Sequence, residues 1–215
     1  MEDIISVEKI AVIANGAVAD YDALLPALKG YDQYIAVDGG LHHCAALGVT
    51  PLFLIGDMDS VEPDMKAKFP NVKELKFKRD KDATDLELAL EFLIKKNPKS
   101  ITIFAGFGDR VDHSLSNLVL LSRYPGKVFL ETEIEILGVI DERLELATHA
   151  GQTVSLIPMN GPALGITTDG LKWELKDDIL DKSFVGISNE AVGTSVLVTL
   201  KAGDLLFSIH KKGGF

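Results

Sequence analysis

Short apolar runs alternate with amphipathic stretches through the first 125 residues, and this alternation limits the possible folds more than any other feature. Runs typical of buried strands occupy 10–14, 34–37, 52–55 and 101–104,. Helical or half-exposed strand patterns lie between and after them, at 21–28, 41–47, 65–69, 75–77, 86–93 and 114–121. Such alternation predicts parallel βαβ units with right-handed crossovers. We therefore predict an N-terminal α/β domain built on a parallel sheet.

The pattern changes after Tyr124-Pro125-Gly126. Short β-rich runs, punctuated by Gly, Asn, Asp and Pro, follow at 127–130, 134–137, 143–146, 153–157, 164–168, 196–200 and 205–210. Many short strands without a long helix predict an all-β sandwich or barrel. We expect one domain over 1–125 and a second over 126–215, with Ser188-Asn189 forming a polar turn.

Composition narrows the class of protein. A chain of 215 residues with 47% hydrophobic and 25% charged residues is globular rather than disordered,. A net charge of −10 argues against nucleic acid or a membrane surface as partner, although local cations and a divalent metal can still hold a nucleotide,. Cys44 is the single cysteine, so an intramolecular disulfide and a thiolate zinc site are excluded,. With no signal-like N-terminus and no apolar run of about 20 residues, we expect a cytoplasmic protein.

The segment Gly56-Asp57-Met58-Asp59-Ser60 follows the run at 52–55 directly. If the backbone stays extended there, Asp57 and Asp59 aim at one point, because alternate side chains share a face. Their repulsion is relieved by a metal, a raised pKa or solvent. Open α/β sheets bind ligands at the carboxyl ends of their strands, which favours a magnesium–phosphate site over the alternative, a solvated acidic turn.

Other strand-end segments are expected at the same edge, because all strands of a parallel sheet end on one side. They are Asp38-Gly39-Gly40, the charged loop 79–85 and the loop 106–113. We predict Asp57, Asp59 and Asp85 as the carboxylates that bind the metal, with Asp38 and Asp82 at outer positions or as a base. The competing interpretations are a tight turn for Gly39-Gly40, a helix-start carboxylate for Asp85, a solvated turn for Asp82 and an ion pair for Arg110. The chain has no Walker-type phosphate loop,.

One aromatic residue stands out in the β-rich half. Trp173, the only tryptophan, follows the segment 167–172. Beside a turn it can anchor a core or an interface, stack on an aromatic ligand or lie over a cation.

Taken together, these motifs resemble thiamine pyrophosphokinases (thiamine diphosphokinases). The resemblance rests, in chain order, on Asp38-Gly39-Gly40, Gly56-Asp57-Met58-Asp59-Ser60, Asp80-Lys81-Asp82-Ala83-Thr84-Asp85, Arg110-Val111-Asp112-His113, Thr168-Asp169-Gly170-Leu171-Lys172-Trp173 and Ser188-Asn189. It implies a Rossmann-like α/β domain followed by a β-sandwich, a homodimer, and magnesium-dependent transfer of pyrophosphate from ATP to the thiamine hydroxyl, giving thiamine diphosphate and AMP.

The resemblance also implies roles for single residues. Asp57, Asp59 and Asp85 correspond to the catalytic and magnesium-binding carboxylates. Residues of the ATP site are implied at Asp38, Gly39, Gly40, Lys81, Asp82, Arg110 and Asp112. The resemblance further implies that Trp173, Ser188 and Asn189 hold thiamine and face the site of the other subunit. Asp109 departs from the family pattern, in which a glycine precedes the arginine, so the nucleotide loop is expected to differ in detail.

Three alternatives remain open at this point. The same scaffold can serve another alcohol, such as a hydroxymethylpterin, although the Gly170–Trp173 segment disfavours it. A non-catalytic module that binds a nucleotide or thiamine would be expected to lack the metal-binding carboxylates. A magnesium-dependent phosphohydrolase would use water as acceptor.

Overall fold

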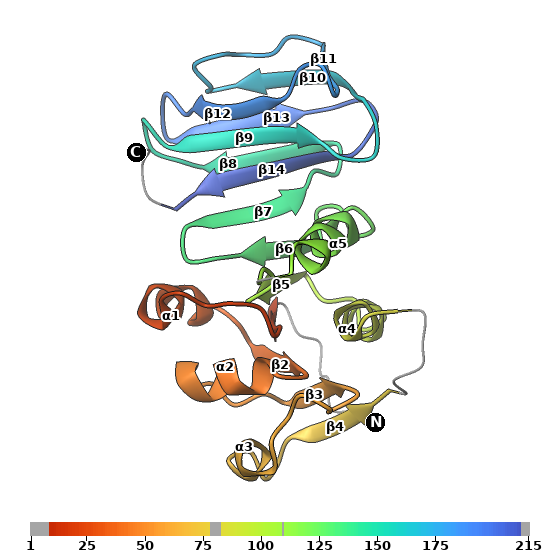
Figure 1. Ribbon diagram of the computed structural model, residues 1–215. Coiled ribbons are helices and arrows are strands. Elements are labelled where there is room, and N and C mark those ends of the chain that lie inside the picture. Colours follow the sequence, from red (N-terminus) through yellow and green to blue (C-terminus); the bar gives the residue numbers. More distant parts are fainter. Residues whose placement is uncertain (1–8, 78–82, 109, 212–215) are drawn as a thin grey trace. The chain divides into compact units, whose positions relative to one another are not determined.

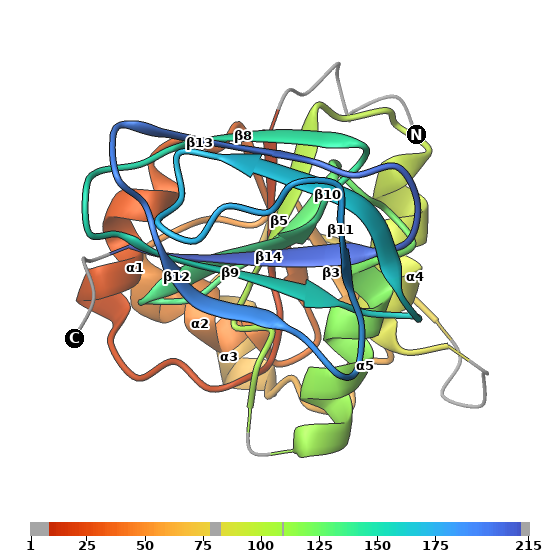
Figure 2. The ribbon, with the colours of Figure 1, turned by 90° about the horizontal axis from the view of Figure 1, so that it is seen from above.

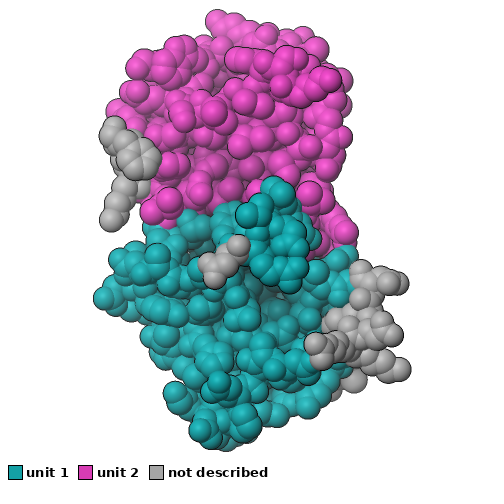
Figure 3. All heavy atoms as spheres, in the orientation of Figure 1, with its two compact units in different colours: residues 1–117, 131–133 teal, residues 118–130, 134–215 magenta. Residues whose placement is uncertain are grey.

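The computed structural model describes residues 9–77, 83–108 and 110–211, and two compact units divide the chain (Figure 3). The N-terminal unit comprises Met1–Asn117 and Glu131–Glu133. The C-terminal unit comprises Leu118–Leu130 and Ile134–Phe215. The assignment of ATP binding, magnesium binding and catalysis to residues 1–125, and of thiamine binding and dimerisation to residues 126–215, stays a prediction.

The N-terminal unit contains a parallel sheet with the strand order β5-β1-β2-β3-β4. Its strands are β1 (Lys9–Ile13), β2 (Gln33–Val37), β3 (Phe53–Gly56), β4 (Lys73–Lys76) and β5 (Ser100–Phe104). Four of them are apolar and buried, whereas β4, at the edge, alternates Leu75 with lysine and glutamate. The predicted parallel α/β architecture is confirmed.

Helices connect these strands: α1 (Tyr21–Leu28), α2 (Gly40–Leu47), α3 (Pro63–Ala67), α4 (Asp85–Ile94) and α5 (Val111–Leu121). Figures 1 and 2 show α1 and α2 on one face of the sheet and α4 on the other. On the first face, Ala11 and Ile13 of β1 belong to the same buried cluster as Leu24 of α1 and Leu41 of α2. Removal of this apolar surface from water stabilises the layer.

Local signals determine where several helices begin and end. The Thr84 hydroxyl accepts a hydrogen bond from the Glu87 N–H at 3.2 Å and caps α4, as the sequence predicts,. Gly48, at φ 67°, ends α2 in the left-handed conformation,. Helix α5 begins at Val111, three residues earlier than predicted, because the Ser114 N–H already bonds to the Arg110 carbonyl.

The C-terminal unit consists of two antiparallel sheets. One has the order β12-β9-β14-β7-β6 within this unit, and the other has the order β11-β10-β13-β8. The strands are β6 (Val128–Glu131), β7 (Glu135–Val139), β8 (Arg143–Ala147), β9 (Thr153–Pro158), β10 (Ala163–Asp169), β11 (Asp178–Leu180), β12 (Gly186–Glu190), β13 (Ser195–Thr199) and β14 (Leu205–His210). Leu156 and Phe207 of the first sheet share one buried cluster with Ile166 and Val198 of the second. The predicted β-sandwich is confirmed.

Two strands of this unit, β11 and β12, are absent from the sequence prediction. The interpretation of Ser188-Asn189 as a polar turn is wrong, because both residues lie in β12. The register of β12 against β9 shifts between Gly186 and Asn189, and Ser188 has φ 57°. Such a bulge interrupts the alternation of side chains by which a strand is recognised in sequence.

Candidate active site

A cavity of about 700 Å³ opens at the carboxyl edge of the parallel sheet in the N-terminal unit. Its walls come from the ends of β1, β2 and β5, from Ser60 after β3, and from the first turns of α4 and α5. Of the predicted site residues, it contains Asp38, Asp85, Arg110 and Asp112. The expected convergence of separate strand-end motifs on one site is therefore found in the fold, as the rule for open α/β sheets requires.

The backbone at this edge adopts conformations that L-residues rarely occupy. Asp38, Met58 and Ala105, which follow β2, β3 and β5, have φ of 46°, 67° and 52°. Each such residue costs on the order of 1 kcal/mol or more, and such strain concentrates at functional sites. Three of the seven non-glycine residues with positive φ in the described part of the chain thus lie at this edge of the sheet, which agrees with a functional site there,.

Asp38 is the centre of an acidic cluster. Its carboxyl group hydrogen-bonds to that of Asp85, accepts the Met58 N–H at 3.3 Å and lies near the charge of Asp57. Burial raises the pKa of Asp38 to about 7, and the negative charges of Asp85 and Asp57 contribute in the same direction,. Asp38 therefore changes between its protonated and its ionised form near neutral pH.

Gly56 makes room for this cluster. A Cβ on Gly56 would lie 1.7 Å from Asp38 Oδ1, and Gly56 has φ 148°, which L-residues rarely adopt,. The glycine at the end of β3 is thus explained by the carboxyl group of the neighbouring strand end.

Asp57 and Asp59 form a tight turn after β3. The Asp59 N–H donates to Asp57 Oδ1 at 3.0 Å, and Asp59 is exposed. Among the residues that the structure describes, no three His, Cys, Asp or Glu side chains are grouped so that they could hold a metal ion. Asp57 and Asp85 each interact with Asp38, and the assignment of Asp57, Asp59 and Asp85 as metal ligands stays a prediction.

Gly39 and Gly40 do not line the cavity. A Cβ on Gly39 would lie 2.2 Å from Asn15 Oδ1, and one on Gly40 would lie 2.0 Å from the Ile13 carbonyl oxygen. Both glycines therefore allow α2 to begin against the end of β1. Their predicted contact with the nucleotide stays a prediction.

Arg110 and Asp112 form a bidentate ion pair at the mouth of the cavity. Arg110 Nη2 lies 2.6 Å from Asp112 Oδ2, and Arg110 Nε lies 3.2 Å from Asp112 Oδ1. The hydrogen bond from Arg110 lowers the pKa of the Asp112 carboxyl group. Both side chains are exposed, so the pair can exchange partners when an anion arrives,. Lys81, Asp82 and Asp109 lie outside the described residues.

Sequence reasoning missed several polar residues of the cavity wall: Asn15, Ser116 and Asn117. Asn117 Nδ2 donates to the Gly106 carbonyl at 2.6 Å and holds the loop after β5. Ser116 and Asn117 follow Asp112 and His113 by about one helical turn, so they lie on the same face of α5. This spacing could have predicted that they line the cavity as well.

A second group of predicted residues meets in the C-terminal unit. Asn189 Oδ1 accepts the Trp173 N–H at 3.2 Å, and Asn189 Nδ2 donates to the Trp173 carbonyl at 2.7 Å. Lys172 Nζ lies 4.8 Å from the centroid of the Trp173 ring and forms an ion pair with Glu190. The indole is 58% exposed, so it is not a core anchor. Ser188, next to Asn189, donates its N–H to Ser155 Oγ at 3.0 Å.

The parallel sheet, with a cavity that contains carboxylates and an arginine at its carboxyl edge, is typical of the large class of α/β proteins that bind a ligand at their strand ends,. The family model for the thiamin pyrophosphokinase catalytic domain matches residues 26–144, and the model for the vitamin B1 binding domain matches residues 140–205. The chain belongs to the thiamin pyrophosphokinase family, whose enzymes use ATP.

Individual relatives agree with this assignment. The thiamine pyrophosphokinase of Bacillus subtilis is 29% identical over 201 residues, covering 85% of this chain and 91% of the relative. Thiamine pyrophosphokinase 3 of Oryza sativa subsp. japonica is 30% identical, covering 74% of this chain and 66% of the relative. The solved structure of the Bacillus subtilis protein superposes with a TM-score of 0.83 at 23% identity, covering 94% of this chain and 99% of that one, which shows the shared fold.

Two further observations concern the length of the helices and the single cysteine. Among the described residues, no helix combines the length and the apolar character needed to cross a membrane. Cys44 is free and buried in α2, and burial raises the pKa of its thiol to about 12, so it is chemically inert,.

Proposed function

We propose that this enzyme transfers the pyrophosphoryl group of ATP to the hydroxyl oxygen of thiamine in a magnesium-dependent reaction that gives thiamine diphosphate and AMP. The observation that carries the proposal is the pair of Asp38 and Asp85 in the cavity wall, with the charge of Asp57 near Asp38, within the segment matched by the catalytic-domain model. The ATP site would comprise Asp38, Gly39, Gly40, Lys81, Asp82, Arg110 and Asp112.

The reaction forms a bond between the thiamine hydroxyl oxygen and the β-phosphorus of ATP, and it breaks the bond between that phosphorus and the oxygen that leaves with AMP. The protein aligns the two reactants and neutralises charge on the phosphates. The Arg110 guanidinium, exposed at the mouth, supplies a planar fork for phosphate oxygens,. Either Asp57 or Asp85 takes the hydroxyl proton.

The donor set fits a magnesium ion. The carboxylates at the ends of β2 and β3 and the start of α4 are hard oxygen ligands, and Asp38 and Asp85 are already within hydrogen-bonding distance of each other,. Magnesium keeps water and phosphate oxygens among its ligands, so it needs only one or two protein carboxylates at a time. We assign Asp57, Asp59 and Asp85 to this role. When bound, the ion supplies Lewis-acid stabilisation of the phosphate oxygens.

Thiamine is an aromatic cation, and the group around Trp173 suits it. An exposed indole, fixed through its backbone by Asn189 and with the Lys172 ammonium over one face, offers its other face for stacking on an aromatic cation,. We assign Trp173, Ser188 and Asn189 to thiamine. We further propose a homodimer in which these residues serve the site of the neighbouring subunit, and a cytoplasmic location.

The test follows AMP release from ATP with and without thiamine, and with and without magnesium, for the wild type and Asp57→Asn. We expect thiamine-dependent AMP with an equal yield of thiamine diphosphate, lost in the variant and in the absence of magnesium. AMP release that ignores thiamine would contradict the proposal in favour of a hydrolase or another acceptor alcohol. Binding of both ligands without turnover would indicate a sensor.

A further inference from the structure

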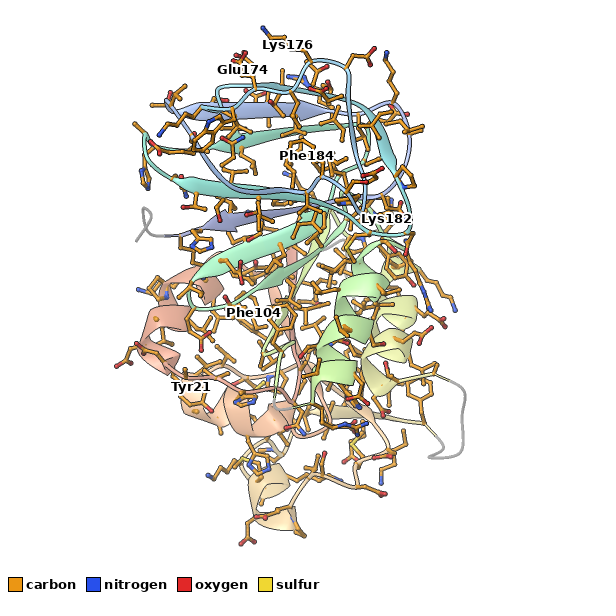
Figure 4. All side chains as sticks on the ribbon, turned by 45° about the horizontal axis from the view of Figure 1, so that its top comes forward. Tyr21, Phe104, Glu174, Lys176, Lys182 and Phe184 are labelled. Atoms are coloured by element: carbon orange, nitrogen blue, oxygen red, sulfur yellow. The ribbon has the colours of Figure 1, made fainter. Side chains whose placement is uncertain are left out.

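His43 on α2 connects three segments of the N-terminal unit. Its Nε2 lies 2.8 Å from the Gly16 carbonyl oxygen, and its Nδ1 lies 2.7 Å from the hydroxyl oxygen of Tyr21 (labelled in Figure 4). A carbonyl only accepts, so Nε2 carries the hydrogen; Nδ1 of the neutral ring then accepts from the Tyr21 hydroxyl. Burial lowers the pKa of His43, which favours this neutral form. The ring is thus a fixed link between the β1–α1 loop, α2 and α1.

The residue that His43 holds belongs to the cavity wall. Asn15 and Gly16 line the cavity, whereas His43 does not. On its other side this loop is already fastened, since the Gly16 N–H donates to the Ala105 carbonyl at 2.8 Å and the Ala17 N–H donates to the Phe107 carbonyl at 2.7 Å. A Cβ on Gly16 would lie 2.0 Å from the Phe107 carbonyl oxygen, so this approach requires a glycine,.

We infer that His43 is a positioning residue: its Nε2–H bond to the Gly16 carbonyl holds the Asn15–Gly16 wall in the shape that receives the nucleotide. The inference rests on the proposed function in one respect, namely that the cavity binds ATP. A wall that is fixed before the ligand arrives does not have to be ordered on binding, and this preorganisation raises affinity without a direct contact. The hydrogen bond between the Tyr21 hydroxyl and His43 Nδ1 fixes the ring but does not involve Asn15 or Gly16.

Two amide variants separate the two bonds of the ring. In His43→Gln the amide nitrogen reaches about as far as Nε2 and can still donate to Gly16. In His43→Asn the shorter amide occupies the place of Nδ1, so it can meet Tyr21 but not Gly16. His42→Gln is the matched control, because its side chain makes no hydrogen bond to another described residue and lies next to His43 on the same helix.

The measurements are the dissociation constant of a non-hydrolysable ATP analogue by calorimetry, the KM for ATP and for thiamine, kcat and the melting temperature. For His43→Asn we expect the nucleotide dissociation constant and the KM for ATP to rise about fivefold, the effect of losing one neutral hydrogen bond, with kcat and the KM for thiamine unchanged. His43→Gln restores nucleotide affinity to within about twofold of the wild type, and the control does not change it.

A role in stability alone would lower the melting temperature of both His43 variants and leave nucleotide affinity alone, and that result overturns the inference, as does an equal loss of affinity in both. If His43→Asn does not fold, Tyr21→Phe and His43→Gln replace it in the test. Both variants keep the hydrogen bond to the Gly16 carbonyl, so both must keep wild-type nucleotide affinity. A fivefold loss of affinity in either one overturns the inference. If the analogue binds as expected but AMP release does not depend on thiamine, the proposed function fails and the role of His43 stands.

Discussion

Replacing Asp38 with asparagine is expected to make the protein more stable and less active. Asparagine preserves the shape of the side chain, tolerates the φ of 46°, accepts the Met58 N–H through its oxygen and donates to Asp85 through its nitrogen,. It removes only the requirement to ionise beside Asp85 and Asp57. The substitution therefore tests whether the acidic cluster costs stability in the folded protein.

The size of the effect follows from the pKa of Asp38. A rise from 3.8 to about 7 corresponds to about 4 kcal/mol at roughly 1.36 kcal/mol per pH unit,. Asp38 is only half-buried, so screening by water reduces this figure to about 1–2 kcal/mol,. Between about pH 4 and pH 7 the folded wild type binds this proton more tightly than the unfolded chain does, so its stability falls as the pH rises through that range. The free-energy cost of ionising Asp38 in the folded protein is absent below about pH 4 and complete above about pH 7,.

The assay is urea unfolding in EDTA at about pH 4 and about pH 8. At the higher pH, Asp38→Asn should exceed the wild type by about 1–2 kcal/mol in the free energy of unfolding, and at the lower pH the two should agree. Glu91→Gln, at an exposed position on α4, is the matched control and should stay within about 0.5 kcal/mol at both values,. A variant no more stable than the wild type at pH 8, or one with the same advantage at both pH values, would refute the reasoning.

Two further substitutions test the strand end and the thiamine group. Gly56→Ala should lower the free energy of unfolding by more than about 2 kcal/mol, because its Cβ would lie 1.7 Å from Asp38 Oδ1 and the backbone has φ 148°,. The control is Gly30→Ala, whose new Cβ has no atom within 4 Å. It should change the free energy of unfolding by less than about 0.5 kcal/mol in the same urea titration,. Trp173→Ala should raise the KM for thiamine about tenfold and leave the KM for ATP and the melting temperature nearly unchanged, since the indole is 58% exposed,; an equal rise in both KM values would count against the assignment.

The sequence predicts those features that follow from periodicity and from strand direction. The alternation of apolar runs was sufficient for the parallel sheet, and Thr84 with Glu87 was sufficient for the start of α4,. Because parallel strands end on one side, the meeting of Asp38 with Asp57 could also be expected. The resemblance to thiamine pyrophosphokinases is confirmed by both family models.

Features that depend on three-dimensional register could not be predicted. The Asp38–Asp85 hydrogen bond joins the end of β2 to the start of α4, and no spacing in the sequence encodes it. Asn15 was visible only as the end of a strand, although its side chain lies against Gly39. The sequence at Ser188 is typical of a turn, because a bulge in β12 breaks the two-residue period of the strand,.

The same comparison explains why stability and function should conflict in this protein. At most positions local preference and fold agree, whereas Asp38 is held at positive φ, against Gly56, with a carboxyl group that cannot easily ionise,. Met58 and Ala105 have positive φ at neighbouring strand ends, and Ser188 has positive φ beside Asn189. These costs persist only because the surrounding structure enforces them. A cation that interacts with the cluster would relieve its repulsion, so the free energy stored at Asp38 becomes available for binding,. The expected gain in stability of Asp38→Asn and its expected loss of activity therefore have one cause.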